Sequence, residues 1–88
     1  MNNKEQAICN IVKGYKGVTY AIVYINKHTR KAVIFACNIN TKQKRLACKK
    51  ILDTYKDIEI VDFSSTKKNW IVTRETLKIY SNEKIFNY

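Results

Sequence analysis

Two apolar runs separated by a short polar segment place the strongest constraint on how this 88-residue chain folds. Val18–Ile25 and Lys31–Cys37 are rich in β-branched and aromatic residues, which favour extended backbone. The polar segment Asn26–Arg30 between them has a length common in hairpin loops, so we predict a β-hairpin. Because the first run is apolar on both faces, we expect a central strand covered on each side. The alternative is that its tyrosine face is open to a partner.

Two other segments show the spacing of amphipathic helices. The first is predicted over residues 4–13 and stops at Gly14, which with Gly17 brackets a turn. The second is capped by Asn40 or Thr41 and extends to about Tyr55. Its apolar positions are Ala47, Cys48, Ile51, Leu52 and Tyr55.

The C-terminal third has a weaker pattern. Ile58–Phe63 alternates loosely and predicts a third strand, followed by a turn over residues 64–69 and a fourth strand over Trp70–Thr73. Residues 73–88 fit either a short helix containing Leu77 or a further strand, and the alternation favours the strand.

These elements predict a single α+β domain over residues 1–88, with two helices packed on an antiparallel sheet. Halves 1–40 and 41–88 also align when displaced by forty residues, which suggests a tandem αββ–αββ duplication. The alternative is that this element order is simply a convenient way to lay two helices on one sheet. The matches place Ala7, Ile11, Tyr15 and Lys16 on Ala47, Ile51, Tyr55 and Lys56.

The charge of the chain points to its partner. Seventeen Lys and Arg against seven Asp and Glu give a formal net charge of +10, and a polyanion is the usual compensation for such self-repulsion. The second predicted helix is the most one-sided segment, with only Asp53 among its cations. The candidate contact residues are Lys27, His28, Arg30, Lys31, Lys42, Arg45, Lys49, Lys56, Lys67 and Lys68.

These cations favour non-enzymatic binding of DNA or RNA, mainly through phosphates and shape. Three arginines in the whole chain limit bidentate reading of guanine edges. Tyr20, Tyr24 and Trp70 are candidate platforms for stacking bases, although a core position explains Trp70 better.

Few residues suit catalysis, and none predicts a cofactor or a metal. Two glycines cannot build a phosphate-binding loop, and His28 is the one histidine. Cys9, Cys37 and Cys48 lack metal-ligand spacing and are expected to be reduced, buried thiols of a cytoplasmic protein. No apolar run reaches the length of a membrane span, and no signal peptide is expected. Unpaired sheet edges make a homodimer plausible.

Two other functions fit the composition. The first is a small interaction protein, of the kind that phages and plasmids encode, that binds and inhibits an acidic host protein. The second is a small basic, toxin-like ribonuclease that uses Tyr20, Tyr24, Arg30 and Lys31 in place of histidines and carboxylates.

Overall fold

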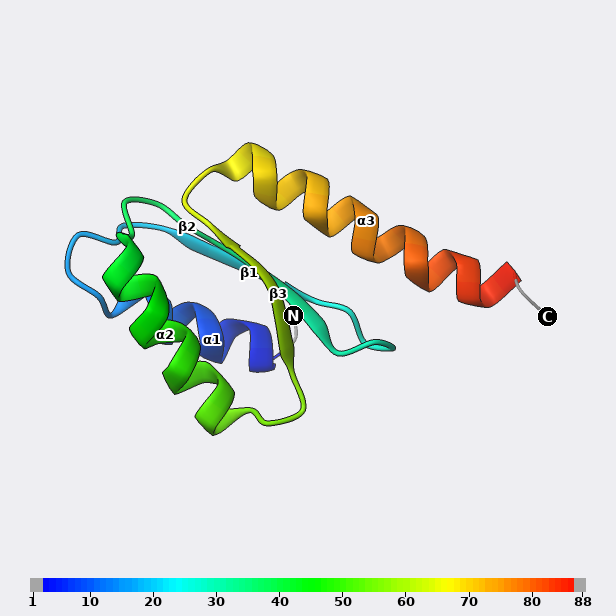
Figure 1. Ribbon diagram of the computed structural model, residues 1–88, viewed down its shortest axis with the longest axis horizontal. Coiled ribbons are helices and arrows are strands. Elements are labelled where there is room, and N and C mark those ends of the chain that lie inside the picture. The colour runs from blue at the N-terminus through cyan, green and yellow to red at the C-terminus, as the bar shows by residue number, and fades with distance from the viewer. Residues whose placement is uncertain (1–2, 87–88) are drawn as a thin grey trace.

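A three-stranded mixed sheet forms the middle layer of the molecule, with helices on both faces (Figure 1). The computed structural model describes the backbone of residues 3–86 and the side chains of residues 3–79. The predicted α+β class is confirmed. The elements are α1 (Asn3–Lys13), β1 (Ala21–Ile25), β2 (Lys31–Ala36), α2 (Thr41–Thr54), β3 (Glu59–Ser64) and α3 (Lys67–Phe86).

The strand order is β1–β2–β3, so β2 is the central strand. β1 and β2 form the predicted antiparallel hairpin, in which Val23 lies opposite Ile34. β2 and β3 are parallel, because α2 carries the chain back to the end of the sheet where β2 begins. The prediction of an antiparallel sheet is therefore wrong for this pair. The prediction that the first strand is central is also wrong, since β1 is an edge strand.

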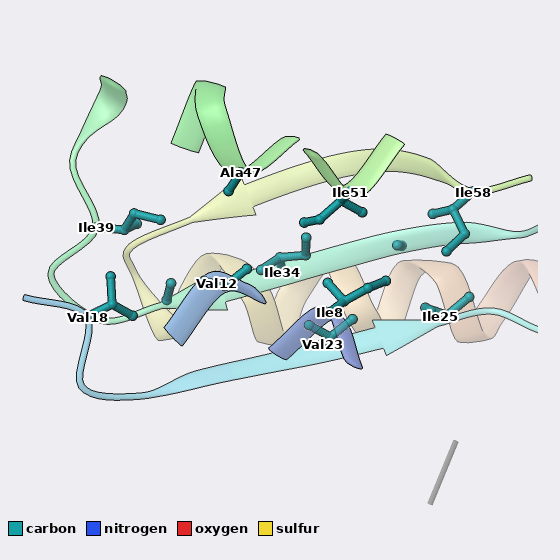
Figure 2. Packing of buried hydrophobic residues seen from close by; sticks show 12 residues of the cluster. Ile8, Val12, Val18, Val23, Ile25, Ile34, Ile39, Ala47, Ile51 and Ile58 are labelled. Atoms are coloured by element: carbon teal, nitrogen blue, oxygen red, sulfur yellow. The ribbon is translucent and has the colours of Figure 1, made fainter. Parts of the chain in front are cut away.

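The larger core cluster lies between the sheet and the pair α1 and α2 (Figure 2). Ile8 and Val12 of α1 are fully buried there, as are Ala47 and Ile51 of α2. They pack on the side chains that alternate along one face of the strands, such as Ile34. The apolar spacing read from the sequence thus fixes which sides of α1 and α2 face the sheet.

Helix α3 covers the opposite face of the sheet. For this part of the chain the sequence had predicted a turn over residues 64–69 and a strand over Trp70–Thr73. The strand prediction is wrong, as is the preference for strand in residues 73–88 as far as Phe86, and the turn is confined to Ser65 and Thr66. Trp70 and Leu77, seven residues apart, bury against Val33 and Phe35 of β2. The Trp70 Nε1–H also donates to the Val33 carbonyl at 3.2 Å. The burial of the second face of β2 by α3 therefore outweighs the strand-like alternation of apolar residues in the C-terminal segment.

Residues 3–86 form three helices rather than the two predicted, and the second half of this range runs helix–strand–helix. The tandem αββ duplication is therefore not confirmed, because α3 stands where the repeat requires a second strand. The residue matches at a displacement of forty reflect two amphipathic helices with similar apolar spacing.

Asn26 joins the hairpin turn to α3. Its side chain is buried, and its Oδ1 accepts hydrogen bonds from the N–H groups of His28 at 2.8 Å and Thr29 at 3.1 Å. Its Nδ2 donates to the Leu77 carbonyl at 2.9 Å. One amide thus shapes the turn and fixes α3 against it.

Two alanine variants separate a helical from an extended α3. In a strand, Leu77 and Ile79 would share a face, whereas in the helix they point about 200° apart. We expect Leu77→Ala to lower the free energy of unfolding by about 2–4 kcal/mol. Ile79 is 56% exposed, and we expect Ile79→Ala to change the same quantity by less than about 0.5 kcal/mol. Urea denaturation measures both, and equal losses would contradict the helix.

The Asn26 contact can be tested by Asn26→Asp, which keeps the acceptor for the turn and removes the donor to Leu77. We expect a loss of about 1–3 kcal/mol in the free energy of unfolding, because a buried carboxylate oxygen would then face the Leu77 carbonyl oxygen with no donor between them. Asn38→Asp is the matched control, since Asn38 is exposed and has a positive φ of 67° that Asp tolerates. Unchanged stability in Asn26→Asp would show that the contact with α3 does not hold the turn.

Candidate nucleic-acid interface

The exposed side of α2 carries a row of cations, which we call the basic ridge: Lys42, Arg45 and Lys49. On the other side of the helix, Ala47 and Ile51 are buried. Successive residues of a helix are rotated by about 100°, so the three ridge residues point directly away from the sheet. All three are exposed, and no ion pair or hydrogen bond to another residue of the described chain engages their side chains.

The start of α2 is held by a capping box. The Asn40 Oδ1 accepts from the Gln43 N–H at 2.8 Å, and the Gln43 Oε1 accepts from the Asn40 N–H at 3.1 Å. The Gln43 Nε2 then donates to the Lys16 carbonyl at 2.9 Å. This bond places the Gly14–Gly17 turn, and with it the exposed Lys16, beside the start of the ridge.

Lys16 is a cation of this surface that the sequence reasoning missed. The two glycines signalled a turn, and the φ of +89° at Gly17 bears this out. Nothing in the local sequence, however, indicates which element such a turn packs against. Its position depends on a contact across 27 residues between the side chain of Gln43 and the backbone of Lys16.

The electrostatics of α2 are unfavourable in the absence of an anion. The first turn holds no acidic residue, although the helix dipole makes that end partially positive. Lys42, Lys44 and Arg45 all lie within the first five residues of the helix. Burial of Ala47 and Ile51 holds the helix in place against this repulsion. A bound polyanion would relieve it.

The other predicted contact residues fall into separate groups. The turn with Lys27, His28, Arg30 and Lys31 lies where β2 begins, at the same end of the sheet as the exposed Lys56 after α2. Lys67 and Lys68 begin α3, which follows the other end of β3 and lies on the opposite face. The structure therefore does not join the ten residues into one patch.

Part of the charge near the hairpin is already paired. Asp57 accepts from the Lys4 Nζ at 3.2 Å, and the Arg30 Nε lies 3.8 Å from the same carboxylate. Arg30 also has a positive φ of 61°, which is uncommon for a residue other than glycine or asparagine. The ridge, by contrast, has no carboxylate within ion-pair distance in the described chain.

The three candidate stacking residues differ in exposure. Trp70 is buried, which confirms the core interpretation. Tyr24 is half-buried, with the Lys78 Nζ 5.8 Å from its ring centroid. Tyr20 is 49% exposed and meets the edge of Phe35 across a centroid distance of 6.1 Å. It stands beside edge strand β1, whereas α2 packs on the β3 side of the sheet.

A groove of about 260 Å³ lies between α1 and β1, lined in part by Tyr20 and Lys13. Within it, the Glu5 Oε2 accepts from the Ile25 N–H at 2.8 Å, and the Cys9 Sγ lies 3.6 Å from the Ala21 carbonyl oxygen. These side chains protect part of the β1 edge without a second copy of the chain. Of the four residues proposed for a ribonuclease, only Tyr20 lines this groove.

The three cysteines are free and half-buried. Burial is the main cause that raises the pKa of the Cys9 and Cys48 thiols, so both are poor nucleophiles near neutral pH. Among the residues that the structure describes, no group of three His, Cys, Asp or Glu side chains is arranged to hold a metal ion.

Comparison with known proteins gives no relative: no family model, curated protein or solved structure matches the chain. Within residues 3–86, no helix combines the length and apolar character needed to cross a membrane.

The ion pairs of Asp57 predict how stability depends on pH. The hydrogen bond from Lys4 holds the pKa of the Asp57 carboxyl below its ordinary value of 3.8. A lowered pKa adds stability that is present above about pH 4 and is lost as pH falls through the folded-state value. We expect Asp57→Asn to lower the melting temperature at pH 6–7, and the difference from the wild-type protein to vanish at the most acidic pH.

The control for this measurement is Asp53→Asn, which removes an exposed carboxylate that forms no ion pair among the described residues. A difference between the wild-type protein and Asp57→Asn that stays constant from neutral to acidic pH would contradict the role given to the carboxylate charge.

Proposed function

We propose that this protein binds nucleic acid without catalysis, through contacts between phosphates and the basic ridge of α2. Lys16 and Lys56 extend the ridge at its two ends. The observation that carries the proposal is the ridge itself, in which three exposed and unpaired cations stand on one side of a helix whose other side is buried. The net charge of +10 also favours this function, because it attracts any polyanion.

The chemistry of the ridge suits phosphates better than base edges. Lysine ammonium groups bind phosphate as point charges and carry no sequence information. Arg45 is the one guanidinium on the ridge, which limits bidentate contacts with guanine. Affinity should therefore come mainly from release of counterions, with little discrimination between sequences.

A triple charge reversal, Lys42→Glu, Arg45→Glu and Lys49→Glu, tests this function. Each lost phosphate contact lowers the steepness of log K against log salt by about 0.9, so the three reversals lower it by about 2.7. With the affinities taken as equal at 1 M salt, we expect binding of a labelled duplex to be about 500-fold weaker or more at 100 mM salt. Fluorescence anisotropy measures the affinity. The circular dichroism spectrum should be unchanged, because all three side chains are exposed.

The matched control reverses three exposed cations of α3, on the opposite face of the sheet from the ridge: Lys67→Glu, Lys68→Glu and Lys78→Glu. It changes the net charge by the same amount, so it reports the effect of overall charge alone. An equal loss in both triple variants would show that the ridge has no special role. An unchanged affinity in the ridge variant would remove α2 from the interface.

An acidic protein partner is the second candidate, and one observation favours it. Leu46 and Leu52 beside the ridge are 49% and 40% exposed, and apolar side chains next to charge are typical of protein interfaces. The two candidates differ in what accompanies the purified protein. A nucleic-acid binder should copurify with material absorbing at 260 nm until it is washed in high salt, whereas an inhibitor of an acidic protein should not.

A further inference from the structure

We infer that the basic ridge takes double-stranded rather than single-stranded nucleic acid. The inference rests on the proposed function and assigns a substrate class to the same surface. It follows from the aromatic side chains near α2, from the shape of the ridge and from the spacing of its cations.

Aromatic rings are the first discriminating feature. Proteins that bind single strands stack the exposed bases on aromatic side chains. Tyr55, at the C-cap of α2, is half-buried against the larger core cluster, and so is Tyr15 near the start of the ridge. Within residues 3–79, the one large exposed ring is that of Tyr20, which lies beside β1. The ridge therefore offers single-stranded bases no exposed aromatic ring on which to stack.

The shape of the surface is the second feature. Sites for single strands are grooves that follow the backbone. The basic ridge is the outward side of α2, a helix that packs on one face of the sheet at the outside of the molecule (Figure 1). The groove described above lies between α1 and β1 and is not lined by any residue of α2.

The spacing of the cations is the third feature. Lys42, Arg45 and Lys49 stand about 4.5 and 6 Å apart along the helix axis, at 1.5 Å per residue. The capping box and the buried Ala47 and Ile51 fix this array. A duplex presents phosphates in an equally regular arrangement, with one charge per about 1.7 Å of its axis, so the backbone of neither partner has to be ordered on binding. A single strand has half as many charges and would lose conformational freedom.

Counterion release gives the size of the preference. With the three ridge residues, Lys16 and Lys56 each contacting one phosphate, the slope of log K against log salt is about −4.5 for a duplex and about −3.5 for a single strand. If duplex and single strand bind equally at 1 M salt, this difference in slope corresponds to about twentyfold tighter binding of the duplex at 50 mM salt.

The experiment compares a labelled duplex of random sequence with each of its separate strands, from 50 to 300 mM salt. A DNA set and an RNA set are both measured, since phosphates are common to the two. We expect the duplex to bind at least tenfold more tightly than its strands at 50 mM salt in one set or both. Equal binding, or tighter binding of the single strands, in both sets would overturn the inference.

Tyr20→Ala is the second arm, because Tyr20 is the exposed ring available for stacking. We expect its affinity for duplex and single strands to equal that of the wild-type protein. A selective loss of single-strand binding in Tyr20→Ala, together with tight wild-type binding of single strands, would move the interface to the β1 side. Failure of the proposed function looks different, since no nucleic acid would then bind with a steep dependence on salt.

Discussion

The burial of β2 on both faces is the constraint on which the rest of the structure depends. Ala32–Ala36 are all buried, so the strand needs apolar cover above and below the sheet. Helices α1 and α2 supply one cover, and α3 supplies the other through Trp70 and Leu77. A chain of 88 residues forms a three-layer structure because its central strand is too apolar to be left half exposed.

Local patterns in the sequence were sufficient for the elements whose partners lie nearby. The helical spacing of apolar residues over 4–13 identified α1, in which Ile8 and Val12 are buried, and the five polar residues Asn26–Arg30 identified the hairpin. The position of α3 could not be predicted in the same way. Trp70 and Leu77 are seven residues apart, a spacing that fits a helix, but Thr76–Tyr80 also alternates. The choice between them depends on the second face of β2, which becomes visible only when the strand order is known.

The residues of the candidate site show the same difference between local patterns and contacts distant in sequence. Periodicity alone placed four cations on one side of a helix. The structure has Lys42, Arg45 and Lys49 there, whereas Lys56 follows the end of α2 at Thr54. Lys16 joins them only through a contact distant in sequence, which periodicity does not report. Lys67 and Lys68 lie apart from the ridge because α3 packs on the opposite face of the sheet from α2, against Val33 and Phe35.

The two roles of Asn26 also bear on the order in which the chain folds. Its bonds to the backbone of His28 and Thr29 close over two and three residues, so they form within the isolated turn. Its bond to the Leu77 carbonyl spans 51 residues and requires α3 to be in place. A contact over that distance costs more loop-closure entropy than a hairpin turn does, and such non-local contacts form late. The hairpin is therefore available as an early template, and the arrival of α3 completes a hydrogen bond whose donor the turn has already oriented.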